Sequence, residues 1–384
     1  VIELKNLYKS YRGKSVLMNI SLTIQDNEFF VLIGSSGCGK TTLLKTLNKL
    51  NPIDKGEILI NGTPINRIKV TQLPRLMGYV VQEGGLFPHM TVEDNIALAM
   101  RVAGYPKEKI YDRITELLEL VNLEPDQYRS QYPSQLSGGQ RQRIGVARAF
   151  AADPEIILMD EPFSALDPMT RAELQDEVHR LQLRFHKTIV FVTHDMDEAV
   201  KLADRICILQ NGHVVQCDKP ENILKHPANE YINSFIGKNR LWENPSFIRA
   251  EDIMRPRPIT ISQSRTVVQA VQLMRHYNID SLLVTGDDNK FAGMVWLQDL
   301  IGIDQYSSPV SSFLSDDYLS VRVDDSLSTV LEKVADYGEK DFGILPVLDA
   351  EGAIRGFLNR SSLLSTLSRR FIDEPVERDE QEGA

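Results

Sequence analysis

A glycine-rich run, GSSGCGKTT at residues 34–42, constrains the fold of this chain more than any other stretch. It follows the apolar segment FFVLI and satisfies the pattern G-x-x-x-x-G-K-[ST], in the strand-to-helix context that this pattern needs. Glycines let the backbone wrap a triphosphate, while amide hydrogens and a helix N-terminus supply positive potential. The run therefore predicts an α/β domain with a triphosphate site, in which Lys40 reaches the terminal phosphates and Thr41 offers a hydroxyl to magnesium. An ordinary glycine-rich turn is the alternative, and the flanking segments disfavour it.

Three further apolar segments lead into polar residues that suit nucleotide hydrolysis. IILMDE ends in Asp160 and Glu161, IVFVTH ends in His194, and Gln82 follows MGYVV. Ligands in open α/β sheets bind at the carboxyl ends of the strands, so we expect Asp160 in the magnesium shell and Glu161 polarising an attacking water. His194 would lie beside the terminal phosphate, and Gln82 would hold the attacking water or magnesium. Alone, an Asp-Glu pair is more often a helix N-cap and a single histidine is usually structural; the loop at Gly34 favours the catalytic interpretation.

The segment LSGGQRQRIGVARAF, residues 136–150, has the pattern of a glycine hinge that opens a basic amphipathic helix. It contains no group that could do chemistry alone. Arg141 and Arg143 lie on this helix, and a solvated face is the simple alternative for at least one of them.

At 384 residues the chain is too long for one core and predicts two or three domains. Up to about residue 236, consecutive apolar runs alternate with helical segments, which indicates a mainly parallel sheet covered on both faces. IELKNLYKSY, SLTI and GEILING, within the first sixty or so residues, instead predict short antiparallel strands packed beside the parallel core. We therefore expect one domain over residues 1–236.

A repeat of about sixty residues follows a linker at residues 237–250. TVVQAVQLM and SLSTVLEKV both place apolar side chains at helical spacing. After each helix come an apolar strand, a turn, a second strand and a short helix. We expect two βαββα units, residues 251–306 and 307–370, and a disordered acidic tail at residues 371–384.

Composition excludes several classes of protein. The formal net charge of −10 disfavours a nucleic-acid partner, since phosphate backbones attract basic surfaces. No apolar run of about 18 residues and no N-terminal secretory signal is found, so the chain is expected in the cytosol. Cys38, Cys207 and Cys217 are odd in number and lack metal-type spacing, which predicts reduced thiols rather than disulfides or a zinc site.

In order and spacing, these motifs resemble those of the ATPase subunits of ATP-binding-cassette (ABC) transporters over roughly the first 235 residues. The matching motifs are the phosphate loop (residues 34–42), the Q-loop at Gln82, the signature LSGGQ (residues 136–140), ILMDE through Glu161, the D-loop SALD (residues 164–167) and the switch histidine His194. The resemblance implies a P-loop NTPase cassette with a RecA-like core, an antiparallel β subdomain and a helical subdomain, which hydrolyses ATP with Mg²⁺.

The resemblance also implies which residues bind ATP. Tyr11 matches the aromatic residue that stacks on adenine. In this family two subunits join head to tail, and the signature of one faces the ATP held by the other, which implies a homodimer with a γ-phosphate contact in trans. The implied ATP contacts are Tyr11, Gly34, Ser35, Ser36, Gly37, Cys38, Gly39, Lys40, Thr41, Thr42, Ser137, Gly138, Gly139, Gln140 and Asp167.

The segment EGGLFPHMTVEDNI resembles the helical-subdomain surface that receives a helix of a membrane permease subunit. Leu86, Phe87 and Pro88 are expected to form a partly exposed apolar groove, with a buried hinge as the alternative. Such a partner implies the cytoplasmic face of a bacterial cell membrane and, indirectly, an extracellular substrate-binding protein. A soluble ATPase without a membrane partner is the other hypothesis, although such chains usually have two cassettes or a long coiled coil.

The repeated units resemble a tandem pair of cystathionine-β-synthase-type (CBS) domains. Such pairs leave clefts that commonly bind adenosine nucleotides, and a familiar form of the motif ends its second strand in G-h-h-T-x-x-D. Here GMVWLQD keeps Asp299 but has Trp296 in place of Thr, and GFLNRSS has Asn359 and Ser362. This departure argues against simple AMP or ATP sensing.

An ABC ATPase followed by a CBS pair resembles the subunits of importers for glycine betaine, carnitine, choline and related quaternary amines, in particular the OpuC-type subunits of Gram-positive bacteria. Related CBS modules bind cyclic di-AMP where two modules pair, which shuts import. Phe342 is expected to stack on adenine, or else to pack in the core, and Arg355 to pair with phosphate. An ionic-strength sensor and an assembly module are the alternatives for this half. The equivalent positions are Ile279, Ser281, Phe342, Ile354, Arg355 and Phe357.

Overall fold

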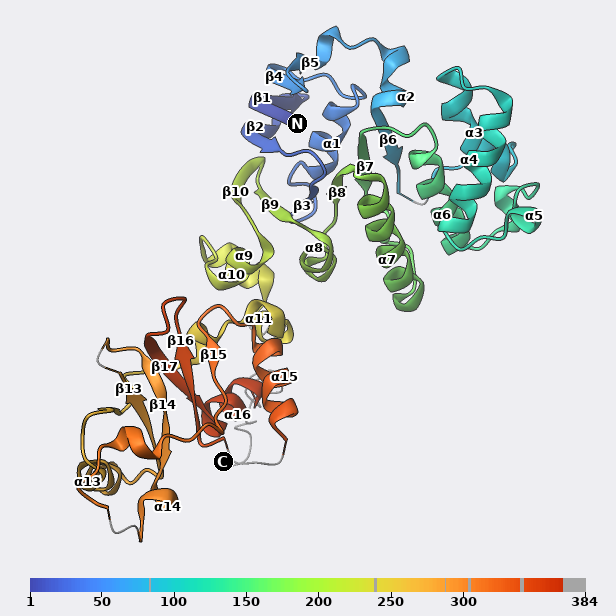
Figure 1. The fold of residues 1–384 in the computed structure, drawn as a ribbon. Coiled ribbons are helices and arrows are strands. Elements are labelled where there is room, and N and C mark those ends of the chain that lie inside the picture. Colours follow the sequence, from blue (N-terminus) through green and yellow to red (C-terminus); the bar gives the residue numbers. More distant parts are fainter. Residues whose placement is uncertain (83, 238–239, 287, 303–304, 339–341, 369–384) are drawn as a thin grey trace, which may run out of the picture. The chain divides into compact units, whose positions relative to one another are not determined.

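The computed structural model describes residues 1–82, 84–237, 240–286, 288–302, 305–338 and 342–368. The expected acidic tail, residues 371–384, lies outside the described residues. The chain divides into two compact units, Val1–Ile236 and Gly237–Ala384 (Figure 1).

A six-stranded sheet forms the centre of the first unit. Its strands are β3 (Phe29–Ile33), β6 (Met77–Val80), β7 (Ile156–Asp160), β8 (Thr188–Val192), β9 (Arg205–Gln210) and β10 (His213–Asp218). Their order is β10-β9-β3-β8-β7-β6, and all neighbours run parallel except β10, which is antiparallel to β9 at one edge. β3, β7 and β8 are buried along their whole length, which explains their uninterrupted apolar sequences.

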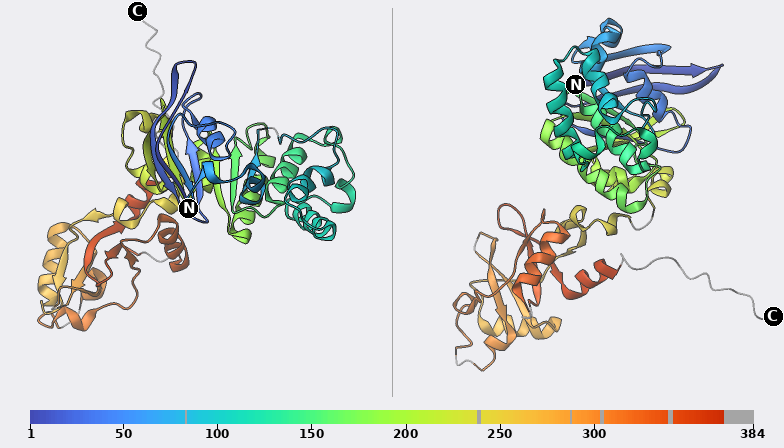
Figure 2. Two further views of the ribbon diagram at one scale, coloured as in Figure 1. Left: turned by 90° about the horizontal axis from the view of Figure 1, so that it is seen from above. Right: turned by 90° about the vertical axis from the view of Figure 1, so that its right-hand side faces the viewer.

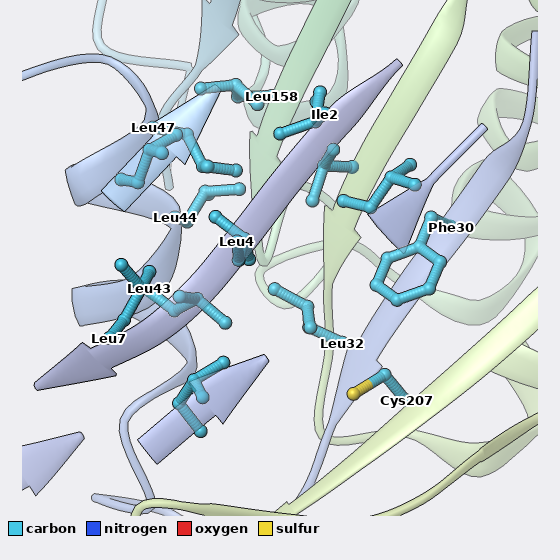
Figure 3. Packing of buried hydrophobic residues seen from close by; sticks show 14 of the residues in the cluster. Ile2, Leu4, Leu7, Phe30, Leu32, Leu43, Leu44, Leu47, Leu158 and Cys207 are labelled. Carbon is cyan, nitrogen blue, oxygen red and sulfur yellow. The ribbon is translucent and has the colours of Figure 1, made fainter. Parts of the chain in front are cut away.

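A second, antiparallel sheet packs beside the first and completes the core. It contains β1 (Ile2–Tyr11), β2 (Lys14–Ile24), β4 (Lys55–Ile60) and β5 (Thr63–Pro64), in the order β2-β1-β4-β5. Side chains from β1, such as Leu4, meet side chains from β3, such as Leu32, and from the helix α1 (Lys40–Leu47), such as Leu44, in one buried cluster (Figure 3). This cluster holds the helix that follows the phosphate loop, and it confirms the expected antiparallel sheet beside a parallel core.

The remaining helices of the first unit cover the sheet and extend beyond it. They are α2 (Leu73–Leu76), α3 (Val92–Val102), α4 (Lys107–Leu120), α5 (Pro125–Tyr128), α6 (Gly138–Phe150), α7 (Pro168–Phe185), α8 (Met196–Leu202), α9 (Pro220–Lys225) and α10 (Glu230–Ile236), with 3₁₀ turns at Ile65–Arg67, Val70–Gln72 and Pro133–Gln135. α3, α4 and α5 lie beyond the edge strand β6 (Figure 2), where α3 and α4 pack on α6 and α5 packs on α4. They form the expected helical subdomain.

The second unit contains the expected repeat. Its first copy comprises β12 (Thr260–Ser262), α13 (Val267–Tyr277), β13 (Ser281–Thr285), β14 (Phe291–Trp296) and α14 (Leu297–Leu300), and its second comprises β15 (Val321–Arg322), α15 (Leu327–Tyr337), β16 (Ile344–Leu348), β17 (Ile354–Asn359) and α16 (Arg360–Ser368). In each copy the first strand is parallel to the second, which pairs antiparallel with the third. Connecting pieces are α11 (Arg240–Glu243), α12 (Ala250–Ile253), β11 (Arg255–Pro256) and 3₁₀ turns at Pro245–Phe247 and Val310–Phe313. Two copies of βαββα are therefore confirmed.

Within the described ranges, no helix has both the length and the apolar character needed to cross a bilayer.

Candidate functional site

The phosphate loop joins β3 to α1, and its backbone requires glycine at two points. Gly34 has φ of 152°, and a Cβ added there would lie 2.2 Å from the carbonyl oxygen of Leu209 on β9. Gly39 has φ of 111°, and a Cβ there would lie 2.8 Å from Cδ2 of Leu17 on β2. Any side chain would clash at either position, which explains the two fixed glycines of the pattern.

Lys40 and Thr41 begin α1 and are bonded to groups at the ends of the parallel strands. Lys40 is buried, and its Nζ donates to the carbonyl oxygens of Gly34 at 2.7 Å and Ser35 at 3.2 Å. The Thr41 hydroxyl donates to Oδ1 of Asp160, at the end of β7, at 2.8 Å. α1 thus brings an ammonium and a hydroxyl to the carboxyl edge of the sheet.

The Asp160 carboxylate has a second partner that the sequence did not indicate. The Tyr79 hydroxyl on β6 lies 3.4 Å from Oδ2 of Asp160. Burial, and then the Asp160 charge, raise the pKa of Tyr79, so its hydroxyl remains a donor at neutral pH. Asp160 is therefore held between Thr41 and Tyr79.

Thr41 and Asp160 fit the magnesium role expected of them. A hydroxyl and a carboxylate within hydrogen-bond distance are the hard oxygen donors that Mg²⁺ prefers. Among the described residues, no three His, Cys, Asp or Glu side chains gather into a site for a metal ion. Mg²⁺ usually keeps several waters and binds phosphate oxygens besides one or two protein ligands, so Thr41 and Asp160 need supply only part of its shell.

Glu161 and His194 meet at the ends of the adjacent strands β7 and β8. Nδ1 of His194 lies 3.2 Å from Oε2 of Glu161. Glu161 has φ of 45°, a left-handed conformation that is uncommon for this residue, and its amide donates to the Val192 carbonyl at 3.0 Å. A small cavity of about 40 Å³ adjoins the pair. It has room for a water molecule beside the carboxylate and the imidazole.

Gln82 lies in an exposed turn after β6. Gly84 and Gly85, which follow in the same loop, are hydrogen-bonded to the helix α6. Arg148 of α6 donates to the Gly85 carbonyl at 2.8 Å and to the Gly84 carbonyl at 3.1 Å. Burial lowers the pKa of Arg148, yet an arginine stays charged at any physiological pH. Arg148 therefore connects the Q-loop to the signature helix, a link that no sequence motif predicted.

The signature forms the N-terminus of α6. Ser137 is the N-cap: its hydroxyl accepts from the Gln140 amide at 3.2 Å, and Oε1 of Gln140 accepts from the Ser137 amide at 2.9 Å. Nε2 of Gln140 also donates to the Tyr128 hydroxyl at 3.0 Å. Ser137 and Gly138 are exposed, so the helix presents an open N-terminus of positive potential.

Of the two arginines expected on this helix, one is buried. Nη2 of Arg143 lies 2.8 Å from Glu173, and Nη1 is paired with the fully buried Glu177, both on α7. Arg141 is partly exposed and donates to the Leu136 carbonyl at 2.7 Å. Arg143 is therefore an internal tie between α6 and α7, and a solvated face remains an option for Arg141 alone.

Two other expected ATP contacts lie at element ends. Asp167 caps α7 by accepting from the Thr170 amide at 3.1 Å, and the hydrogen bonds from Thr170 lower the pKa of Asp167. Tyr11 ends β1 with 43% of its surface exposed, and Nζ of Lys9 lies 5.1 Å from its ring centroid. An exposed ring of this kind is accessible for stacking on a base.

In the second unit, two of the expected regulatory residues lie near one another. Ser281 begins β13 and is buried. A Cβ added at Gly343 would lie 3.2 Å from Oγ of Ser281 and 2.7 Å from the Trp296 ring. Phe342, next to Gly343, is 6% exposed and belongs to the core of the second repeat, with the Arg360 guanidinium 5.5 Å from its ring centroid. The ring of Phe342 is thus packed as the core alternative describes.

The other expected regulatory residues lie elsewhere in the second unit. Ile354 is opposite Leu348, at the far end of the β16–β17 pair from Gly343. Arg355 is exposed, and its Nε donates to Asp349 at 2.8 Å. The two remaining positions are Phe357, on β17, and Ile279, which packs on the core of the first repeat. A single chain therefore does not bring the six positions into one cluster.

A cleft of about 470 Å³ lies within the second unit, and its lining residues carry negative charge. It contains Trp296 and Asp299, the two residues that mark the altered CBS motif in the first repeat. The lining residues are Asp280, Trp296, Gln298, Asp299, Ser315, Asp317 and Tyr337. Three carboxylates here disfavour an anionic ligand.

Comparison with known proteins identifies both units. The sequence matches the ABC transporter family over residues 17–164 and the CBS domain over residues 250–304 and 310–369. It is 44% identical to the choline transport ATP-binding protein OpuBA of Bacillus subtilis, over 95% of each chain. It is equally identical, at 44% over 95% of each chain, to the glycine betaine/carnitine/choline transport ATP-binding protein OpuCA of the same organism.

Solved structures agree with the fold of the first unit. The dimeric structure of MJ0796, a bacterial ABC transporter cassette, matches with a TM-score of 0.53 and 33% identity, over 57% of this chain and 99% of that one. The OpuBA and OpuCA relatives, in contrast, extend over nearly the whole chain, including the second unit. The chain therefore belongs to the ABC transporter family, as an ATP-binding cassette subunit with a C-terminal pair of CBS domains.

Proposed function

We propose that this chain is the ATP-hydrolysing, energy-coupling subunit of an importer for quaternary-amine solutes such as glycine betaine, carnitine and choline. The observation that carries the proposal is the assembly of Thr41 with Asp160, and of Glu161 with His194, at one edge of the parallel sheet beside the phosphate loop. The substrate class is supported by the names of the relatives, which transport choline or glycine betaine, carnitine and choline.

We infer the roles of the site residues from their positions together with the resemblance to the family. Lys40 binds the terminal phosphates in exchange for its bonds to the loop carbonyls, and Tyr11 stacks on adenine. Thr41, Asp160 and Gln82 would hold Mg²⁺, and the ion would supply positive charge opposite the phosphate oxygens. Glu161 orients the attacking water and accepts its proton.

His194 affects the attacking water indirectly, because it contacts both Glu161 and the terminal phosphate. Its Nδ1 is close enough to Glu161 to fix the orientation of that carboxylate, and its ring adjoins the small cavity. Nε2 would then be the nitrogen that faces a phosphate oxygen.

The signature requires a second copy of the chain. The hydroxyl of Ser137 and the side chain of Gln140 are bonded within their own helix cap. What α6 offers a nucleotide is its N-terminus at Gly138 and Gly139, with the potential of a helix dipole. We infer that this end contacts the γ-phosphate bound by a partner copy, as the dimeric cassette relative suggests.

A groove on the cassette supports a permease partner at the cytoplasmic face of the membrane. It has a volume of about 430 Å³, lies between the sheet edge and the helical subdomain, and includes Phe87, which is 42% exposed. Leu86 and Pro88, also expected there, are not among its lining residues. Arg148, which holds the Q-loop glycines, lines the same groove, so a helix bound there would contact the attachment of the Q-loop. The lining residues are Asn48, Leu73, Pro74, Met77, Gly78, Tyr79, Val81, Gly85, Phe87, Leu98, Ala99, Val102, Arg148 and Ala149.

We propose cyclic di-AMP as the regulatory ligand of the CBS pair, bound where two such pairs meet rather than in the acidic cleft. The ligand carries two phosphates, and the cleft presents Asp280, Asp299 and Asp317. Arg355 is exposed on β17 and needs only to exchange Asp349 for a phosphate. An ionic-strength sensor and a pure assembly module are the other possibilities.

Uptake in cells tests the transport function. The chain, or its Lys40→Ala variant, would be expressed with its permease and extracellular binding subunits in a bacterium that lacks osmoprotectant uptake. We expect labelled glycine betaine, carnitine or choline to enter only with the unaltered chain. ATP hydrolysis without uptake of any of the three would reject the substrate class, and failure to co-purify with the permease would reject the importer assignment.

A further inference from the structure

Two cysteines outside the nucleotide site lie directly opposite each other on neighbouring strands. Cys207 on β9 and Cys217 on β10 are paired in the antiparallel register, so their side chains project from the same face of the sheet. Directly opposed residues in such a pair have Cα atoms about 4.5–5.5 Å apart. Disulfides span Cα separations of about 4.4–6.8 Å. The backbone is therefore already in the range that a disulfide between these residues requires.

The two thiols differ in exposure. Cys207 is fully buried beside Phe30 and Leu32 in the core of the first unit (Figure 3). Cys217 packs against the same cluster but is partly exposed on the edge strand β10. Small solutes can therefore reach Cys217 first, while Cys207 lies behind it.

A cation is placed on the sulfur of the exposed member. Nη2 of Arg205, two residues before Cys207 on β9, lies 3.2 Å from Sγ of Cys217. Nη1 of Arg205 lies 3.1 Å from Oε1 of Glu28, which fixes the guanidinium in place. An arginine beside a thiol favours the thiolate, and the thiolate is the reactive form.

The charged and titratable groups around the pair favour ionisation of Cys217. A hydrogen bond with Cys207 and the Arg205 charge lower the pKa of Cys217 to about 7, against the opposing effects of burial and the Glu28 charge. The hydrogen bond with Cys217 and burial raise the pKa of Cys207, and Cys38 also faces it. More of Cys217 than of an ordinary thiol is therefore thiolate at neutral pH, and the thiolate fraction increases as the pH rises.

We propose that Cys207 and Cys217 form a peroxide-sensitive thiol pair that closes into a reversible cross-strand disulfide. The Cys217 thiolate attacks one oxygen of hydrogen peroxide; the O–O bond breaks, and the hydroxide that leaves takes up a proton to become water. The Cys207 thiol then gives up its proton as its sulfur attacks the sulfenic sulfur of Cys217, and the S–O bond breaks to release a second water. Two thiols are oxidised and one peroxide is reduced to two waters.

The pair is adjacent to the nucleotide site through one strand. Cys207 is in register with Leu32 on β3, and Ile208 with Ile33, so β9 runs beside the strand that enters the phosphate loop. The carbonyl of Leu209 is the group that excludes a side chain at Gly34. A disulfide would therefore fix β9 to β10 next to the start of the phosphate loop.

The third cysteine is an internal control for reactivity. Cys38 lies within the phosphate loop and is buried, and burial raises its pKa. Its thiol is therefore mostly protonated at neutral pH and reacts more slowly than Cys217.

Oxidation of the reduced full-length chain tests the pair. The protein would be treated with hydrogen peroxide, digested and mapped by mass spectrometry. We expect a peptide pair joined between Cys207 and Cys217 that has lost two hydrogens and is restored by dithiothreitol. A disulfide that involves Cys38, or oxidation of Cys217 to sulfinic acid without any crosslink, would overturn the proposal.

Substitutions separate the two steps. With Cys207→Ser, dimedone should trap a sulfenic acid at Cys217, and with the partly exposed Cys217→Ser, neither adduct nor disulfide should form. Persistent oxidation of Cys207 in the Cys217→Ser chain would show that Cys217 is not the attacking thiol.

The role of Arg205 has its own readout. Iodoacetamide labelling of Cys217 as a function of pH should have a midpoint near 7 in the unaltered chain. Arg205→Met should shift the midpoint upward and slow labelling at pH 7 by up to about tenfold, while Arg205→Lys should retain most of the reactivity. Arg184→Met is the matched control, because Arg184 pairs instead with Glu116 on α4. An unshifted profile in Arg205→Met would reject the proposed activation.

Discussion

The cassette and the CBS pair both draw their expected functional residues from distant parts of the sequence, but they place them differently. In the cassette, Thr41 on α1 bonds to Asp160 at the end of β7, and Glu161, just after β7, lies within hydrogen-bond distance of His194, just after β8. In the CBS pair, Ser281 and Arg355 lie on separate sheets, and Arg355 is paired with its own neighbour Asp349.

The difference has a simple physical origin. Parallel strands end at the same edge of a sheet, so residues that follow them converge whatever their separation along the chain. The antiparallel β16–β17 pair instead places the residues before one strand and the residues that begin the next at opposite ends of the hairpin. The parallel sheet therefore brings these cassette residues together within one chain, whereas the antiparallel hairpin keeps the CBS positions apart.

The cassette half of this comparison fails if Glu161 is not the catalytic base. Glu161→Gln should keep ATP binding but lose about 10²- to 10⁴-fold in turnover, because an amide orients water but cannot accept its proton. Phosphate release and equilibrium nucleotide binding measure the two effects. The matched control is Glu155→Gln at the other end of β7, where the side chain accepts only from Asn61 at 2.9 Å among its described bonds. Near-normal hydrolysis in Glu161→Gln would contradict the assignment.

The second largest effect should be on stability, at the buried tie between α6 and α7. Arg143→Met leaves Glu177 buried without its cation and should cost about 3–5 kcal/mol of unfolding free energy. Arg141→Met, on the exposed side of the same helix, should cost less than about 1 kcal/mol. Urea denaturation, followed by far-ultraviolet circular dichroism, compares the unfolding free energies of the two variants. If Arg143→Met costs as little as Arg141→Met, the protein tolerates an unpaired charge at Glu177.

Sequence reasoning recovered the cassette well because its motifs are contiguous and lie at strand ends. Gly34, Gly39, Asp160 and His194 could be placed without coordinates, since a strand followed by a polar residue fixes which edge that residue occupies. The CBS repeat was also visible, from helical spacing at an interval of about sixty residues.

Side-chain contacts between different helices and strands could not be predicted from the sequence in the same way. Arg148 reaches the Q-loop glycines, and Tyr79 reaches Asp160, through tertiary packing that leaves no local pattern. Arg143 has the spacing of a surface arginine, and only the position of α7 shows that it is buried against Glu177. The partners of a long polar side chain depend on which helix packs over it.

Removing one charge from each of two regions, the exposed start of β17 and the acidic cleft, tests the CBS half of the comparison. Arg355→Ala should weaken cyclic di-AMP binding about tenfold, or about 1.4 kcal/mol, because a guanidinium paired with phosphate is lost. Asp299→Asn, in the acidic cleft, should leave binding unchanged. Isothermal titration of the full chain measures both. Weaker binding in Asp299→Asn with normal binding in Arg355→Ala would move the site into the cleft, and no binding to the unaltered chain would remove this ligand.

The smallest effect compares one structural device that occurs in both units. Ser137 caps α6 by accepting from the Gln140 amide at 3.2 Å, and Ser326 caps α15 by accepting from the Thr329 amide at 3.1 Å. Replacing either serine with alanine should cost about 0.5–2 kcal/mol locally, so amide hydrogen exchange at Gln140 or Thr329 should accelerate severalfold.

ATP turnover should then separate the two caps. Ser137→Ala should slow hydrolysis, because the first turn of α6 must be ordered when it meets the nucleotide of a partner copy, and the deficit should persist at saturating ATP. Ser326→Ala should loosen its own helix by a similar amount and leave hydrolysis unchanged. If both variants hydrolyse ATP normally while their helix ends exchange faster, the N-terminus of α6 is only a structural cap, and the trans contact assigned to the signature is wrong.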